Sequence, residues 1–275
     1  MLPIPTFFSA TNKCGGAVRI LLICPIPIEY MMCRTALSLR DGPRVQGCRT
    51  ARGLVGNVDV MAIETGPAKA RAAAATVAGI SHFQPDLAVD TGTCGALDGD
   101  LIIRAVVVGT SCLEYDISGG GMPSRIIAEM RLPSAFDFLP RKDGQKLVRE
   151  LTELGKDRGL HVRAGVQACG EFFIQSPEVR DPLAALTGAL AANWETAGVF
   201  VAALRAGVPP LSIRGISDLG DERSLRDFRR NARRVSRALY GFIRSLVASG
   251  WFSRFDDRWR DAGIARSRLV KSVLP

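Results

Sequence analysis

The chain has 275 residues, 47% of them hydrophobic, and a formal net charge of +9. That size and hydrophobic content support a substantial core in one large domain or two small ones, and they exclude a largely disordered chain. No uninterrupted apolar run approaches the roughly 20 residues that a membrane-spanning helix needs. The N-terminal stretch MLPIPTFFSATNKCGG has no basic residue ahead of its short apolar run and no clear cleavage site, so we predict no secretory signal.

Cysteine and histidine usage argues against disulfides and structural metal sites. The seven cysteines are odd in number, no two are spaced as C-x-x-C, and the only histidines are His82 and His161. We therefore expect reduced thiols, a cytoplasmic location and no metal. No G-x-G-x-x-G fingerprint follows the first strand and the Walker phosphate loop is missing, so we also predict no cofactor.

The positive charge is concentrated near the C-terminus. Residues 222–275 carry 14 basic and 5 acidic side chains, whereas the rest of the chain carries 22 of each. A basic segment of this kind can contact nucleic acid or an anionic membrane surface, and deleting residues 251–275 would test that interpretation. A solvated, arginine-rich helix face followed by a tail is the more common explanation. We therefore expect neither a membrane partner nor a nucleic-acid partner.

The first half of the chain alternates between strand-like and helix-like patterns. Residues 18–24 (VRILLIC) form a continuous apolar run, typical of a strand buried on both faces. Gly66-Pro67 precedes an Ala-rich stretch, which favours a helix because Pro fits the first turn and Ala is the best helix former. In chain order the patterns predict a strand at 18–24, a helix near 28–39, two strands within 45–65, a helix near 68–83, and strands at 87–97 and 101–110.

The second half begins with a stretch at 117–145 that is rich in Gly, Pro and Ser, which predicts a long loop of the kind that often forms a lid. The patterns that follow predict a helix at 146–158, a strand at 161–171, a helix at 177–186, a strand at 189–194, a helix at 195–207 and a strand at 211–217. Apolar residues then recur at helical spacing, which predicts a long amphipathic helix packed on the sheet: Phe228, Val235, Leu239, Phe242, Ile243 and Leu246. This periodicity fades after about Trp251.

Strands that alternate with helices predict one α/β domain with a mixed, mostly parallel twisted sheet flanked by helices. No internal repeat and no Pro/Ser-rich linker interrupts the chain. We divide it into an N-terminal extension at 1–17, a catalytic-type domain at 18–250 and a basic C-terminal tail at 251–275.

Four segments of the sequence, which occur in a characteristic order, indicate a function. ETGPAKARAAAATVAGISHFQPDLAVDTGTCGAL, CGEFFI, NWETAG and IRGISDLGD together resemble the purine nucleoside phosphorylase and methylthioadenosine/S-adenosylhomocysteine nucleosidase superfamily. PIPIE after the first strand is similar to the N-terminal glutamate region of the hydrolase branch. The resemblance runs from about Val18 to Val247. It implies the three-layer fold of nucleoside phosphorylases, a purine nucleoside as the small-molecule partner, and a homo-oligomer.

Cleavage of a nucleoside passes through an oxocarbenium-like sugar, so the purine needs a proton and a nucleophile must approach the opposite face. The resemblance implies that Asp218 protonates N7, which requires a pKa raised by burial. An N-cap aspartate ahead of the long helix is the structural alternative. It likewise implies that Glu29 activates water, whereas an exposed glutamate at a helix start is the alternative.

The same resemblance assigns residues to the ribose. Glu195 matches the second glutamate of the E-M-E motif of the family, which accepts hydrogen bonds from ribose hydroxyls, and Trp194 replaces the methionine beneath the sugar. Asn193 replaces the first glutamate, and an amide can keep a hydrogen bond but not the charge. A first-turn acid on a helix and a core aromatic are the structural alternatives for Glu195 and Trp194.

Phe173 matches the phenylalanine that stacks on the purine, and Ile174 matches a residue whose backbone contacts the base. Alternation along a strand would turn Phe172 into the core. The Gly-rich turn of T-G-T-C-G could bring backbone N–H groups close to an oxyanion or a water, and the substrate-binding set therefore also includes Gly92, Thr93 and, beside Asp218, Ser217.

Two departures separate the chain from phosphorylases. Asp90 stands where the hexameric phosphorylases have an arginine before the Gly-rich turn, and a carboxylate there would repel phosphate. PIPIE replaces their early phosphate-binding G-D-P loop. The sequence therefore favours a purine nucleosidase that releases the base from an adenine nucleoside. A phosphate-dependent phosphorylase and a catalytically weakened nucleoside-binding relative, suggested by Asn193 and Trp194, remain the alternatives.

Overall fold

A computed structural model describes residues 16–116 and 131–273. Nearly all of the N-terminal extension expected at 1–17 lies outside the described residues, as does the first half of the loop predicted at 117–145. No described helix is long and apolar enough to cross a membrane.

The described strands form one mixed sheet of ten members. They are β1 (Val18–Cys24), β2 (Arg40–Asp41), β3 (Thr50–Val55), β4 (Val58–Glu64), β5 (Leu87–Ala96), β6 (Val106–Glu114), β7 (Leu132–Pro133), β8 (Val162–Cys169), β9 (Ala189–Asn193) and β10 (Pro210–Asp218). Their order is β10-β6-β8-β9-β5-β1-β4-β3-β2, with β7 beside β6. The predicted α/β domain with a mixed sheet is confirmed.

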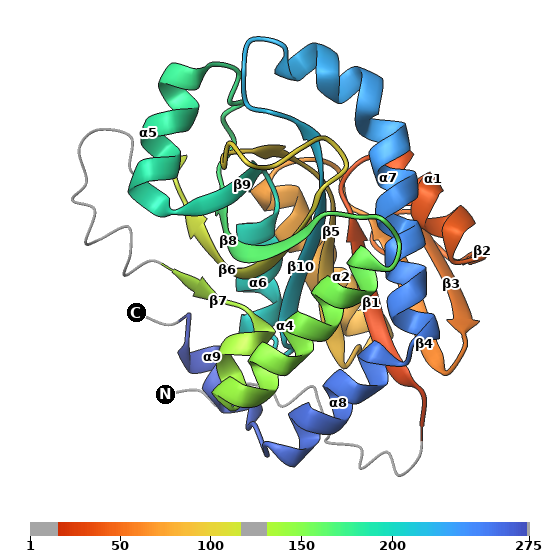
Figure 1. The fold of residues 1–275 in the computed structure, drawn as a ribbon. Helices are drawn as coiled ribbons and strands as arrows, with labels where there is room; N and C mark the ends of the chain where they lie inside the picture. Colours follow the sequence, from red (N-terminus) through yellow and green to blue (C-terminus); the bar gives the residue numbers. More distant parts are fainter. Residues whose placement is uncertain (1–15, 117–130, 274–275) are drawn as a thin grey trace, which may run out of the picture.

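One part of the sheet closes on itself. Strand β10 pairs in parallel with β5 and antiparallel with β6, and β6, β8 and β9 continue in parallel. An antiparallel pairing of β9 with β5 completes the ring. Closure leaves these five strands without free edges, whereas β1, β4, β3 and β2 extend the sheet outward from β5 (Figure 1).

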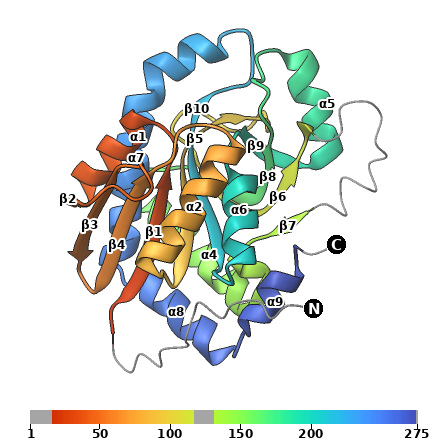
Figure 2. The ribbon, with the colours of Figure 1, turned by 180° about the vertical axis from the view of Figure 1, so that it is seen from behind.

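Helices cover both faces of the sheet. The described helices are α1 (Pro27–Ala36), α2 (Lys69–Phe83), α4 (Arg141–Lys156), α5 (Pro177–Thr187), α6 (Thr196–Arg205), α7 (Ser224–Ala248), α8 (Trp251–Asp261) and α9 (Arg266–Lys271), with a 3-10 turn, η2, at Ala135–Phe138. Figure 1 shows α4 and α7 in front of the sheet, and Figure 2 shows α2 and α6 on the opposite face.

Strand β1 lies between these layers, as its continuous apolar run predicts. Ile20 and Leu22 belong to the core cluster beneath α1, α4, α7 and α8. Leu21 and Ile23 belong to the cluster beneath α2 and α6. Since successive side chains of a strand point to opposite faces, only an uninterrupted apolar sequence can bury both.

The C-terminal segment is not the tail that the fading periodicity suggested. Helix α8 buries Trp251, Phe252 and Phe255 in the main core, and α9 buries Leu269. Part of the positive charge is neutralised, because Arg254 and Arg258 of α8 form ion pairs with Glu150 of α4. Deleting residues 251–275 would therefore remove aromatic side chains from the core, and it would not isolate a binding function of the tail.

Three predicted boundaries are wrong. The strand expected at 101–110 begins at Val106, because Arg104 has a left-handed backbone (φ 77°) and the N–H of Ala105 bonds the carbonyl of Ile102 in a turn. The loop expected at 117–145 contains β7, η2 and the first turn of α4 in its described part. The strand expected to run through Glu171 ends at Cys169.

Candidate active site

A pocket of about 400 Å³ opens at the C-terminal ends of β5 and β10. Loops that follow β1, β8 and β9 complete its wall, so the site lies where α/β sheets usually bind ligands. The lining is mainly apolar and aromatic. The charged side chains among its described lining residues are Glu29, Glu195, Arg214 and Asp218.

Glu29 lies in the first turn of α1 and is 2% exposed. Its Oε1 accepts hydrogen bonds from the backbone N–H of Thr93 at 2.7 Å and from the Thr93 hydroxyl at 2.8 Å. Its Oε2 accepts from the N–H of Ile26 at 3.2 Å. Burial raises the pKa of Glu29 to about 7, against the opposing effect of the positive charge on Arg214. The side chain is thus a buried carboxyl that titrates near neutrality, and not an exposed helix-start glutamate.

Asp218 ends β10 and is 3% exposed. The N-cap of α7 is Arg223, so Asp218 is not the cap of that helix. Its Oδ1 accepts a 3.3 Å hydrogen bond from the N–H of Gly220. Burial raises the pKa of Asp218, while its hydrogen bonds act in the opposite direction. Asp218 therefore keeps its proton to a higher pH than an ordinary aspartate does.

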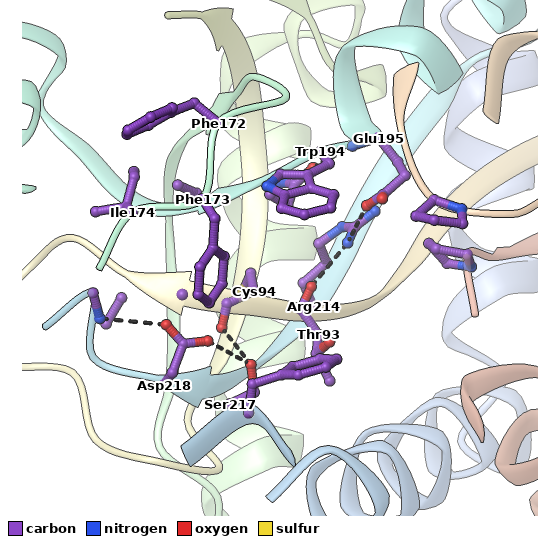
Figure 3. Close-up of a pocket in the computed structure, with 18 of the residues that line it drawn as sticks. Thr93, Cys94, Phe172, Phe173, Ile174, Trp194, Glu195, Arg214, Ser217 and Asp218 are labelled. Atoms are coloured by element: carbon purple, nitrogen blue, oxygen red, sulfur yellow. Dashed lines mark hydrogen bonds and ion pairs between the residues drawn. The ribbon is translucent and has the colours of Figure 1, made fainter. Parts of the chain in front are cut away.

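Ser217 links Asp218 to the neighbouring strand (Figure 3). The Ser217 hydroxyl lies 2.9 Å from Asp218 Oδ2 and 3.2 Å from the carbonyl oxygen of Cys94. A hydroxyl has one proton to donate, and the shorter contact is the one to Asp218 Oδ2. This hydrogen bond lowers the pKa of Asp218, against the larger effect of burial.

Two glycines of β5 make room for the two carboxyls. A Cβ at Gly92 would lie 2.9 Å from Glu29 Oε2, and Gly92 also has a positive φ of 129°. A Cβ at Gly95 would lie 2.8 Å from Asp218 Oδ1. The T-G-T-C-G segment is therefore not the turn that its glycines suggested. It continues as strand to Ala96, and the N–H of Thr93 is already bonded to Glu29.

Arg214 joins the pocket to the interior. It is fully buried, and its Nη1 contacts Glu195 Oε2 at 3.1 Å and donates to the carbonyl of Thr93 at 2.9 Å. Its other edge donates from Nε and Nη2 to the two carboxylate oxygens of Asp90, at 2.8 and 2.6 Å. Asp90 thus lies behind the pocket and pairs with an arginine. Asp90 is not among the residues that line the pocket, so any repulsion of phosphate by its charge acts from behind the wall.

Glu195 lies at the N-cap position of α6, but its carboxylate does not cap that helix. Instead Oε1 accepts from the N–H of Ala68 at 3.1 Å and Oε2 pairs with Arg214. Burial raises the pKa of Glu195, and the charge on Arg214 lowers it.

Asn193 supplies the cap in its place. Its Oδ1 accepts from the N–H groups of Glu195 and Thr196, at 3.0 and 2.9 Å, and its Nδ2 donates to Gln167. Asn193 borders the pocket, yet these bonds direct its amide toward α6 and the interior. A carboxylate-to-amide change here therefore alters a buried network.

Aromatic side chains form one wall of the pocket. Phe173 and Trp194 meet edge to face, with ring centroids 6.1 Å apart, and Ile174 is buried beside them. Figure 3 shows Phe173 and Trp194 between Asp218 at one end and Glu195 at the other. Phe172 does not enter the core as expected; it is 54% exposed, because β8 has already ended and strand alternation no longer applies.

The structure thus brings the site residues predicted from the sequence to one pocket, except Gly92, which lies against Glu29 and does not line the pocket. Sequence reasoning missed Arg214, which lines the pocket, and three interior residues behind it, namely Gln167, Thr196 and Ser212. Arg214 was visible in the IRGISD motif, but nothing in the sequence paired it with Asp90. Within residues 16–116 and 131–273 no cluster of three or more His, Cys, Asp or Glu could hold a metal ion.

Comparisons with known proteins identify the family of the chain. The family described as the phosphorylase superfamily matches residues 19–248. A 5'-methylthioadenosine/S-adenosylhomocysteine nucleosidase of Exiguobacterium sp. is 27% identical over 216 residues, which is 74% of this chain and 87% of that protein. The enzyme of the same name from Staphylococcus aureus is 25% identical over 170 residues, 62% of this chain and 72% of that protein.

Solved structures share the fold. The Helicobacter pylori 5'-methylthioadenosine/S-adenosylhomocysteine nucleosidase with butyl-thio-DADMe-Immucillin-A gives a TM-score of 0.74 at 21% identity, over 85% of this chain and 99% of that one. The native futalosine hydrolase of Helicobacter pylori gives a TM-score of 0.73 at 21% identity, over 85% and 98%.

Proposed function

Because this chain belongs to the phosphorylase superfamily, we propose that it hydrolyses the N-glycosidic bond of an adenine nucleoside. The relatives named above act, by their names, on 5'-methylthioadenosine and S-adenosylhomocysteine, and we propose a substrate of that type. The observation that carries the proposal is the pair of buried carboxyls, Glu29 and Asp218, in one apolar pocket. Their raised pKa values suit one as a base and the other as an acid near neutral pH.

In this mechanism Asp218 donates a proton to N7 of the purine. Protonation turns the base into a better leaving group as the bond to the sugar lengthens. Burial favours the neutral acid before reaction, and it outweighs the hydrogen bonds from Ser217 and Gly220, which lower the pKa of Asp218. Phe173 stacks on the purine, Ile174 contacts it through its backbone, and offset aromatic contact contributes about 0.5–1.5 kcal/mol beyond burial.

Glu29 takes the proton from the attacking water. The backbone N–H and hydroxyl of Thr93 fix its Oε1, and Gly92 leaves room for the carboxylate. A base with a pKa of about 7 is ionised in a large fraction of molecules at neutral pH and is still basic enough to accept a proton.

Glu195 and Trp194 serve the sugar. The carboxylate of Glu195 accepts hydrogen bonds from ribose hydroxyls and stabilises positive charge on the ring, while Trp194 packs beneath it. Asn193 acts through the cap of α6, which places Glu195. As in other members of the family, we expect a homo-oligomer, which light scattering on the purified protein would check.

Water is the better nucleophile for this pocket. Arg214 is the one cation among the described lining residues, and its charge is opposed by Asp90 and Glu195. Glu29 adds a further carboxyl on the same side, so a phosphate dianion would meet net repulsion.

The test is a product assay with 5'-methylthioadenosine, S-adenosylhomocysteine, adenosine and inosine, with and without phosphate. Release of free base and free sugar without phosphate is expected. Release only with phosphate would establish a phosphorylase and refute the role of Glu29. Tight binding of a nucleoside without any release would establish a binding protein.

A further inference from the structure

Asp90 is a buried carboxylate for which the proposed mechanism has no direct use. It is wholly buried on β5, and Arg214 lies on the adjacent strand β10. Besides the two bonds from Arg214, its Oδ2 accepts from the hydroxyls of Thr196 at 2.6 Å and Ser212 at 2.8 Å. Arg214, Thr196 and Ser212 together direct four hydrogen bonds at this side chain, which also forms an ion pair with Arg214.

The Thr196 hydroxyl connects Asp90 to the position at 193. Thr196 Oγ1 lies 2.6 Å from Asp90 Oδ2 and 2.8 Å from Asn193 Oδ1. It has a single proton, and the shorter contact to the charged acceptor takes it. The amide at 193 can tolerate that arrangement because Gln167 and two backbone N–H groups remain as partners. A second carboxylate at 193 would place two anions around one hydroxyl proton in the interior, which is strongly unfavourable.

We propose that Asp90 and Asn193 form a coupled pair, in which Asp90 carries the one negative charge that the network accepts and thereby positions Arg214.

The consequence for the pocket follows from the shape of the guanidinium. Asp90 occupies the edge formed by Nε and Nη2, which leaves Nη1 for Glu195 and the carbonyl of Thr93. Without the negative charge of Asp90, the positive charge of Arg214 would attract Glu195 and Glu29 more strongly. These are the carboxyl groups that we propose bind the sugar and activate the water. Asp90 is thus a positioning residue that acts through Arg214. Its catalytic readout rests on the proposed function.

The experiment compares the wild type with Asp90→Asn, Asn193→Asp and the double exchange Asp90→Asn/Asn193→Asp. Each single variant is expected to lower kcat on 5'-methylthioadenosine by about 10–100-fold, because a misplaced group of this kind costs up to about 10²-fold. The double exchange restores one negative charge and one amide, so its kcat should return to within about tenfold of the wild type.

Ser212→Ala is the matched control. It removes one hydrogen bond to Asp90 without changing any charge, so kcat should fall by no more than about threefold. A loss in Ser212→Ala as large as in Asp90→Asn would mean that hydrogen bonding and not charge matters at this site, which refutes the proposal. So would a double exchange whose loss equals the product of the two single losses.

Thermal unfolding of the same set separates this proposal from the proposed function. Both single variants should unfold at lower temperature than the wild type, and the double exchange should recover most of that loss whether or not the protein is a nucleosidase. A wild type that releases no base would refute the function and leave the coupling measurable. Recovery of the unfolding temperature without recovery of kcat would show a purely structural pair and overturn the positioning role.

Discussion

Each end of the pocket holds a buried carboxyl group, and the two groups have different hydrogen-bond partners. Glu29 accepts three hydrogen bonds from N–H and O–H groups and lies in the field of Arg214. Asp218 accepts one backbone N–H and faces a serine whose proton has another acceptor. Burial raises the pKa of both carboxyls, and hydrogen-bond donors oppose that effect at both ends. The two ends differ because Glu29 also lies in the field of a cation, which favours its carboxylate form.

The strongest test of that difference is Asp218→Asn. An amide cannot deliver a proton to N7, and general acid catalysis contributes about 10²–10⁴-fold, so kcat should fall by that range. Base release from 5'-methylthioadenosine at saturating substrate measures it. Turnover close to that of the wild type would remove Asp218 from the mechanism.

Glu29→Gln tests the opposite end. Loss of the base should lower kcat by about 10²–10³-fold if water is the nucleophile. The amide nitrogen of the glutamine would also face a hydrogen-bond donor, either the N–H of Ile26 or the donors of Thr93, and could not accept from it. Full activity in this variant when phosphate is added would indicate phosphorolysis, which needs no base for water.

The pH dependence follows from the same assignment. Glu29 must be ionised to act, and its pKa is raised to about 7, so kcat/KM should fall about tenfold per pH unit below that value. A profile that stays flat between pH 5 and pH 7 would contradict the assignment of Glu29.

The smallest expected effect is that of Ser217→Ala. One hydrogen bond to Asp218 is lost, and a bond of about 1 kcal/mol corresponds to roughly a fivefold change in kcat. The control is Ser236→Ala, which removes another buried hydroxyl, one without a partner in the described structure. If both variants lose the same activity, the Ser217 contact has no special role in positioning Asp218.

Much of the fold follows from local sequence. The apolar run of β1, the Ala-rich α2 and the spacing along α7 are decided by residues close together in the chain, and these elements lie where their patterns predict. Helix α8 was missed because its apolar residues are aromatic and separated by charges. They become core only because α4 and α7 offer them a surface.

For the site, the sequence determined which carboxyls, glycines and aromatic side chains meet, because they stand at strand ends and strand ends converge. Only the tertiary structure decided their charge states and partners. The pairing of Asp90 with Arg214 joins residues 124 positions apart, and the pKa of Glu29 depends on its burial. Burial and long-range pairing are properties of the packed chain, so no local pattern could specify them.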